Sequence, residues 1–172
     1  LGGSLNATGT TRFRISAQQY ISDGFRHNSY LGRDDSNSRD ELSLRVRLQF
    51  EPSDSVAAKL AFIYSDIDNG YDAFALDNSY TVLSDKPGKD AQESLGASAR
   101  FDWAFADEMA FTSITSLASS EMTFSFDADW GNADSWAPFV YDFVSFTERE
   151  RDTISQEFRL GNEQWMFGAY VS

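Results

Sequence analysis

Apolar and polar side chains alternate along several stretches of the chain. The clearest stretch is residues 39–50, RDELSLRVRLQF, where every second residue from Leu42 to Phe50 is apolar and the residues between them are polar or charged. A period of two is typical of a β-strand with one apolar and one polar face. We therefore predict a strand here, with Arg45 and Arg47 on its polar face.

Similar alternation predicts about seven strands in all, over residues 11–21, 39–50, 55–65, 94–105, 109–118, 152–160 and 165–172. Two strands are less regular, because Ile114 falls on the polar side of its strand and Gln156 interrupts the apolar side of another. The predicted fold class is all-β and antiparallel.

The connections between these strands alternate in length. Short turns are expected near residues 51–54, 106–108 and 161–163, and long loops near residues 22–38, 67–92 and 125–147. Outer-membrane barrels have short periplasmic turns and long extracellular loops, whereas a soluble β-sandwich does not need all its long loops at one end. This pattern favours an up-and-down transmembrane β-barrel wall.

Composition agrees with that interpretation and excludes others. Aromatic residues make up 15% of a chain with a mean hydropathy of −0.43, and no apolar run reaches the roughly 18 residues of a spanning helix. Aromatic side chains beside the short turns would form an interfacial belt: Phe50, Trp103, Phe105, Phe111, Trp165 and Phe167. The net charge of −13 argues against a nucleic-acid partner, and the absence of Cys excludes disulfides and thiolate sites.

Residues 23–45, DGFRHNSYLGRDDSNSRDELSLR, resemble the TonB-dependent outer-membrane receptors. In that family a strand ends in an aromatic residue and Asp-Gly-Phe, and the chain returns as Arg-Asp-Glu and an alternating strand ending in Pro-Ser-Asp, here Pro52, Ser53 and Asp54. YSDIDNGYDAFALDNS, SLGASARFDW, RDTISQEFRL and WMFGAYVS are similar to later parts of the same barrel, so the resemblance covers nearly the whole chain.

The resemblance implies a barrel of about 22 strands, closed by an N-terminal plug, in the outer membrane of a Gram-negative bacterium. It implies active uptake of a scarce nutrient such as a ferric siderophore, with energy delivered by the TonB complex through the plug. Residues 1–172 contain no recognisable plug and begin without a secretory signal, so we expect one partial barrel domain of a longer protein.

Acidic residues of the long loops are weak candidates for a metal site. Asp66, Asp68 and Asp72 surround Gly70, as carboxylates around a calcium ion do, but the Gly stands one position early for an EF-hand and the bidentate Glu is missing. A solvated loop is the stronger interpretation for them and for Asp127, Asp129 and Asp134. We expect neither a metal nor a cofactor.

Two further groups are candidates for ligand binding. Loop aromatics offer a stacking surface, or alternatively pack on one another: Tyr71, Phe74, Trp130, Trp136, Phe139 and Tyr141. Basic residues predicted to face the lumen attract an anionic chelate, or alternatively pair with nearby carboxylates: Arg45, Arg47, Lys59, Arg100 and Arg159. The single histidine, His27, lacks the context of an activated serine, so no enzymatic activity is expected.

Two alternatives to a receptor remain open. A passive porin-type barrel would lack a plug, and a soluble β-sandwich binding module would dissolve without detergent. An isolated wall would instead leave two unpaired edges and a broad apolar face, which predicts aggregation in water.

Overall fold

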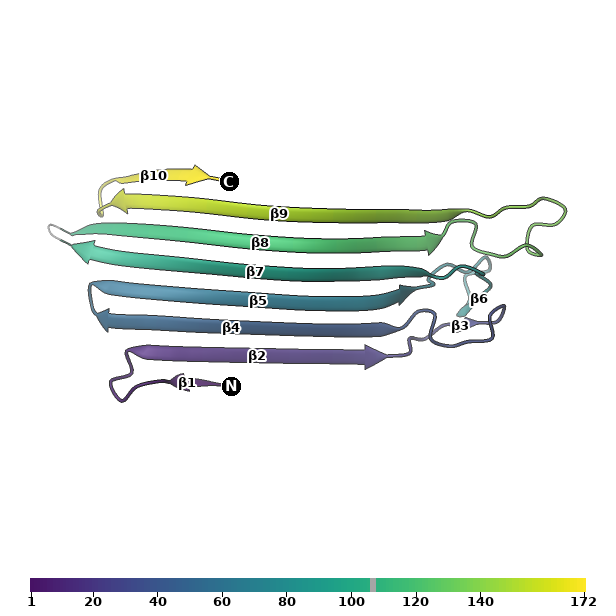
Figure 1. The fold of residues 1–172 in the computed structure, drawn as a ribbon, viewed down its shortest axis with the longest axis horizontal. Helices are drawn as coiled ribbons and strands as arrows, with labels where there is room; N and C mark the ends of the chain where they lie inside the picture. The colour runs from purple at the N-terminus through teal and green to yellow at the C-terminus, as the bar shows by residue number, and fades with distance from the viewer. Residues whose placement is uncertain (106–107) are drawn as a thin grey trace.

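The computed structural model describes residues 1–105 and 108–172 and contains a curved antiparallel sheet of eight strands (Figure 1). In sheet order the strands are β1 (Gly2–Ser4), β2 (Thr11–Ser22), β4 (Arg39–Ser53), β5 (Val56–Tyr71), β7 (Gly88–Phe105), β8 (Met109–Asp127), β9 (Val144–Gly161) and β10 (Met166–Val171). Spatial order follows chain order, which is the up-and-down arrangement. The sheet is open, with β1 and β10 at its two edges.

The all-β antiparallel prediction is confirmed, and each of the seven predicted segments overlaps a strand of the sheet, although 165–172 extends beyond β10 at both ends. The bounds predicted for the longest strands were too short, because β8 continues to Asp127 and β9 already begins at Val144. The eighth strand, β1, has the sequence GGS and pairs with β2 through three residues. Within the described residues, no helix is long and apolar enough to cross a bilayer.

The connections alternate as predicted. β4 and β5 are joined at residues 54–55 and β9 and β10 at residues 162–165, while the long loops 23–38, 72–87 and 128–143 all lie at the opposite end (Figure 1). The predicted turn at 106–108 lies largely outside the described residues. The long loops contain a small parallel pair, β3 (His27–Asn28) and β6 (Thr81–Val82).

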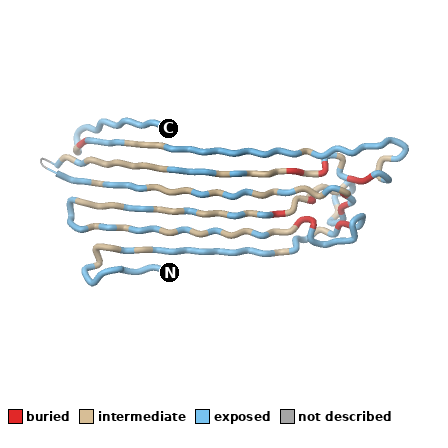
Figure 2. Tube along the Cα trace, in the orientation of Figure 1, coloured by how far each residue is buried: buried red, intermediate tan, exposed pale blue. Residues whose placement is uncertain are grey.

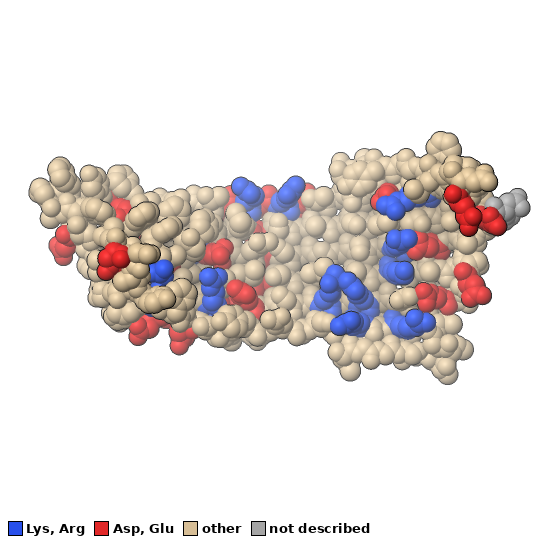
Figure 3. All heavy atoms as spheres, turned by 180° about the vertical axis from the view of Figure 1, so that it is seen from behind, with Lys and Arg blue, Asp and Glu red and all other residues tan. Residues whose placement is uncertain are grey.

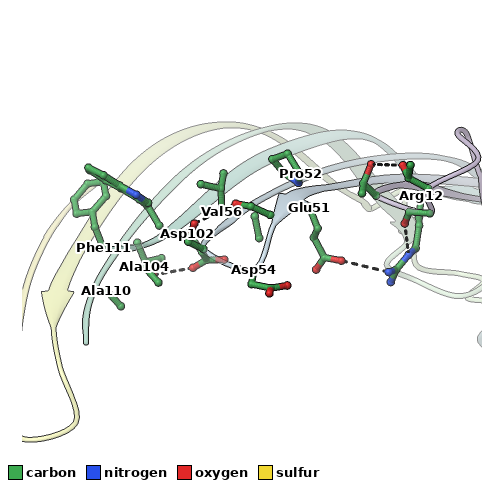
Figure 4. Close-up of a pocket in the computed structure, with 17 residues that line it drawn as sticks. Arg12, Glu51, Pro52, Asp54, Val56, Asp102, Ala104, Ala110 and Phe111 are labelled. Atoms are coloured by element: carbon green, nitrogen blue, oxygen red, sulfur yellow. Dashed lines mark hydrogen bonds and ion pairs between the residues drawn. The ribbon is translucent and has the colours of Figure 1, made fainter. Parts of the chain in front are cut away.

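The register between strands gives the sheet one apolar and one polar face. One row across five strands is apolar: Val46, Phe62, Ala97, Leu117 and Ile154. The next row, on the other face, is polar or small: Arg47, Ala61, Ser98, Ser116 and Ser155. The polar face is concave: in Figure 4 Arg12, Glu51 and Asp54 point to the hollow side of the arc of strands, and Val56 points the opposite way.

The two irregular positions fit this geometry. Ile114 lies on the concave face between Arg100 and Glu157, as predicted. Gln156 lies on the convex face, where it accepts a 2.6 Å hydrogen bond from Thr115 Oγ1 and donates one of 3.0 Å to Ser113 Oγ. These hydrogen bonds between neighbouring strands satisfy polar groups on an otherwise apolar face.

The sheet has no buried hydrophobic core. Among the described residues Val82 is the only buried hydrophobic side chain, and it lies in the loops. Figure 2 shows the buried residues gathered mainly at the long-loop end, while nearly all of the sheet is intermediate or exposed. Large apolar side chains such as Leu60 and Leu117 are about half exposed on the convex face, at 51% and 50%.

We predict that Gly88→Ala destabilises the sheet by about 1–3 kcal/mol, the usual cost of overpacking. A Cβ at position 88 would lie 1.9 Å from the carbonyl oxygen of Ser125, and this backbone atom cannot move without distorting β8. Gly96→Ala is the matched control, since its Cβ would meet only the Leu117 carbonyl oxygen at 3.9 Å. Equal urea midpoints for the two variants of the full-length protein would contradict the prediction.

Candidate functional site

The three long loops pack into a single cap at one end of the sheet. Loop 72–87 occupies the middle, and its strand β6 pairs with β3 of loop 23–38. The backbone N–H of His27 donates to the Tyr80 carbonyl at 3.1 Å, and that of Ser29 donates to the Val82 carbonyl at 3.1 Å. These hydrogen bonds join segments more than 50 residues apart in the sequence.

Asp72 holds the first two loops together. Its carboxylate is buried, at 4% exposure, and accepts hydrogen bonds of 2.7 Å from both Asn28 Nδ2 and Ser36 Oγ. Asn28 is also fully buried and donates a second hydrogen bond of 2.8 Å to the Ser84 carbonyl. A buried carboxylate is retained only with such partners, so Asp72 has a structural role in the cap.

Loop 128–143 attaches to the other side of loop 72–87. Asn132 Nδ2 donates to the Leu83 carbonyl at 2.8 Å, and the backbone N–H of Asp85 donates to the Gly131 carbonyl at 2.9 Å. An ion pair between Lys86 and Asp142 joins the same two loops. All three loops therefore form one hydrogen-bonded unit.

Three of the predicted ligand-binding aromatics lie in one cluster. Phe74 stacks on Trp130 with ring centroids 4.9 Å apart, and Tyr71 contacts Phe74 at 6.0 Å and Phe124 at 4.9 Å. Phe126 completes the cluster and, like Tyr71 and Phe124, lies on the concave face by strand register. Trp130 remains 41% exposed. The long-loop end of the concave face therefore carries an aromatic wall, of which the strand residues Phe124 and Phe126 were not predicted.

The remaining predicted aromatics form a second cluster within loop 128–143. Trp136 and Phe139 both contact Tyr141, at 6.0 and 6.3 Å. The Trp136 indole N–H donates to the Asp129 carbonyl at 3.1 Å, so this ring is tied to its own loop. The structure therefore divides the predicted set into two groups, and much of each group packs on other loop aromatics.

The predicted acidic metal ligands do not come together. Asp66 and Asp68 lie on the convex face, where Lys89 Nζ is 3.2 Å from Asp68 Oδ1, while Asp72 is buried in the cap. In the part of the chain that the structure describes, no group of three or more His, Asp or Glu side chains is arranged to hold a metal ion. Asp72 is not free to coordinate a metal ion, because its carboxylate already accepts hydrogen bonds from Asn28 and Ser36.

Asp127 and Asp129 shape the third loop. Asp127 Oδ1 accepts hydrogen bonds from the backbone N–H groups of Asp129 and Trp130, and Asp129 Oδ2 accepts one from the N–H of Phe143. These contacts hold Trp130 in a left-handed conformation, with a φ of 62°. Asp134, the third residue of this candidate group, is exposed.

The basic residues of the concave face fall into two classes. Arg100 and Arg159 pair with carboxylates two residues away on the same strand: Arg100 Nε lies 2.8 Å from Asp102 Oδ2 and Arg159 Nε lies 2.5 Å from Glu157 Oε1. Among the described residues, Arg45 and Arg47 have no carboxylate within ion-pair distance. This difference can be read from the sequence, because residues two apart on a strand point to the same face. Arg100 and Arg159 each have an acidic residue two positions away, whereas Arg45 and Arg47 do not.

Sequence reasoning overlooked Arg14. It lies on β2 directly opposite Arg47 and has no ion-pair partner within the described ranges. Arg12, two residues before Arg14, lies in a hollow of about 620 Å³ near the short turns (Figure 4). There Arg12 Nη2 is 3.5 Å from Glu51 Oε2, so this arginine has an ion-pair partner. None of the predicted site residues lines this hollow.

His27 lies on β3, with Nδ1 2.6 Å from Asp34 Oδ1. Both side chains are more than half exposed, at 52% and 79%. An exposed pair of this kind contributes little stability and has the geometry of a surface ion pair.

Replacing Asp72 by Ala should loosen the cap. Two buried donors, Asn28 Nδ2 and Ser36 Oγ, would each lose a hydrogen bond, at a cost of about 1–3 kcal/mol for a buried group left without a partner. We expect faster trypsin cleavage after Arg26 and Arg33 of loop 23–38 in the full-length protein. Asp66→Ala removes an exposed carboxylate and is the control; equal cleavage of both variants would exclude the proposed role of Asp72.

The stability of loop 128–143 should depend on the protonation of Asp127. Burial raises the pKa of this carboxyl, and the charge of Asp129 adds to the effect. A raised pKa in the folded state means that the stabilising contribution is present at low pH and is lost as the pH rises through that pKa. Asp127→Asn should therefore slow proteolysis of the loop at pH 7, and this difference from the wild type should become smaller at pH 5. The exposed Asp134→Asn variant should follow the wild type, and a wild-type loop equally resistant at both pH values would disprove the coupling.

Comparisons with known proteins do not assign the chain. No family model matches it, and no curated protein or solved structure does. A functional assignment therefore depends on the geometry of the sheet, its two faces and its loops.

Proposed function

We propose that this chain forms part of the wall of an outer-membrane β-barrel, in a TonB-dependent receptor that takes up a scarce nutrient such as a ferric siderophore. The observation that carries the proposal is the uncovered apolar convex face opposite a polar concave face. A soluble protein of this size buries such a face in a core, whereas a barrel wall presents it to lipid.

The dimensions of the apolar face support a membrane location. On β7 the band runs from Leu95 to Trp103, which is about 27 Å along the strand at roughly 3.4 Å per residue, or about 21 Å along the membrane normal for a strand tilted by about 40°. The apolar band of an outer-membrane barrel is about 25 Å tall. The strands continue beyond the band towards the cap, so the long loops would stand clear of the lipid.

The convex face changes character abruptly at the cap side of this band. Four acids occupy one row across neighbouring strands: Asp66, Glu93, Glu121 and Glu150. Carboxylates in register cannot remain charged in hydrocarbon, so this row marks the water side of the membrane boundary. At the other end of the band Trp103 and Phe111 are paired, and Phe167 follows two strands further on, as an interfacial aromatic belt requires.

The more specific assignment to a receptor is supported by the loops and by the resemblance of residues 23–45. Passive channels have less need of a large ordered cap, whereas a receptor must hold its ligand before transport. The aromatic wall of Tyr71, Phe74 and Trp130 offers an apolar surface at the mouth of the concave face. Under this proposal the partners are outer-membrane lipid, the nutrient and the TonB complex acting through a plug domain.

Fractionation of the producing cells tests the barrel. The protein, expressed with its native flanking sequence and signal, should appear in the outer-membrane fraction and migrate differently on gels with and without heating, as closed barrels do. A soluble monomer without a heat-dependent shift would refute the proposal. A heat-modifiable barrel that supports no TonB-dependent uptake under iron limitation would instead be a passive channel.

A pair of adjacent substitutions tests the assignment of the faces. Leu117→Arg places a charge within the convex apolar band, where an Arg costs up to about 2–4 kcal/mol depending on its depth, and should reduce the heat-modifiable form. Ser116→Arg places the same charge on the concave face and should be tolerated. The reverse result would mean that the lipid-facing side has been misassigned.

A further inference from the structure

Small side chains cover β7 and β8 in the middle of the concave face. This small-residue floor has three successive rows across the two strands, and Ser65 and Ala61 of β5 extend the first and the third: Ser94, Ser120, Gly96, Ala118, Ser98 and Ser116. In the middle row the β5 residue is Ile63, which is 44% exposed and gives the floor an apolar edge beside Arg45. Figure 3 looks into this concave face: a central area without charged side chains has Lys and Arg side chains on either side of it. Neighbouring strands are about 4.8 Å apart, so the floor is wide enough for a small organic molecule.

Gly96 indicates that something approaches this floor closely. It lies in the interior of β7, where Gly weakens a strand, and its φ is not positive. A Cβ here would meet only the Leu117 carbonyl oxygen, at 3.9 Å, so packing within the sheet does not require Gly. A strand glycine without a structural reason often marks the approach of a ligand or another backbone.

Arginines without carboxylate partners border the floor on its β4 side. Arg14 and Arg47 are directly opposite each other on β2 and β4, and Arg45 is two residues from Arg47 on the same face. Like charges directly opposite destabilise a sheet. All three side chains are exposed, and no described carboxylate lies within 4 Å of them.

The opposite border is also basic. Arg149 and Arg151 follow each other on the concave face of β9, beside Met122 and Ser120 of β8, and they too have no ion-pair partner in the described part of the chain. From β4 to β9 is four strand spacings, or about 19 Å along the sheet. In a chain with a net charge of −13, five arginines therefore surround one uncharged floor.

We propose that Arg14, Arg45 and Arg47 form a binding site for a multivalent oxyanion that lies on the small-residue floor. Guanidinium groups bind carboxylate or phosphate oxygens in a bidentate manner, and such an anion would relieve the repulsion between Arg14 and Arg47. Serine hydroxyls of the floor supply hydrogen bonds to the rest of the ligand. This site depends on the proposed function in one respect: the concave face must line the interior of the barrel.

Calorimetric titration of the full-length protein in detergent, at low ionic strength, tests the site with citrate and pyrophosphate as probes. We expect one of these anions to bind, and Arg47→Gln and Arg14→Gln each to weaken binding about tenfold, the loss expected from one charge-assisted hydrogen bond. Arg159→Gln removes an equal charge from the same face, where Glu157 already pairs with it, and should change the affinity less than about twofold. Preference for citrate would identify a carboxylate ligand, and preference for pyrophosphate a phosphate ligand.

Heat-modifiable migration of each variant separates this test from that of the barrel. A properly closed barrel that binds neither anion overturns the site while leaving the proposed transport function intact. Equal weakening by Arg159→Gln and Arg47→Gln also overturns it, since the effect would then reflect general charge. If Arg47→Gln lowers the melting temperature but no anion binds, carboxylates of the protein itself occupy the arginines and the ligand site is refuted.

Discussion

The register between neighbouring strands is the constraint on which the rest of this structure depends. Successive side chains of a strand point to opposite faces, so a slip of one residue would exchange the two faces of that strand. Across β4, β5, β7 and β8 the pairing keeps Val46, Phe62, Ala97 and Leu117 in one row. The apolar band and the acidic row of the convex face, and the grouping of Arg14, Arg45 and Arg47 on the concave face, all depend on this register across the sheet.

Sequence reasoning located the strands where one face had to be apolar. Residues 39–50 and 94–105 alternate because their convex side chains form the band, and both lie in strands of the structure. The outer part of β9 was missed because both of its faces are polar there: Glu148 and Glu150 alternate with Arg149 and Arg151. A strand that is polar on both sides carries no periodic signal, and its extended form depends on pairing with β8.

The candidate site was less accessible from sequence. The aromatic residues of the loops were recognised by type, but their division into two clusters depends on contacts such as that of Phe74 with Trp130, which are 56 residues apart. Asp72 was grouped with its sequence neighbours Asp66 and Asp68, whereas its actual partner Asn28 is 44 residues away. Pairing within one strand was predictable in principle, because Asp102 stands two residues after Arg100 and Arg47 has no such neighbour.

The interlocked cap constrains how such loops can diversify. Its middle loop is bound to a neighbour on each side, through Asn28 and Ser84 on one and through Asn132 and Leu83 on the other. Transplanting residues 72–87 alone onto another antiparallel sheet would carry the centre of the cap without the loop surfaces to which it hydrogen-bonds. The outer surface of a cap of this design would thus change through coordinated substitution in all three loops, or through exposed side chains such as Trp130 that leave the shared hydrogen bonds untouched.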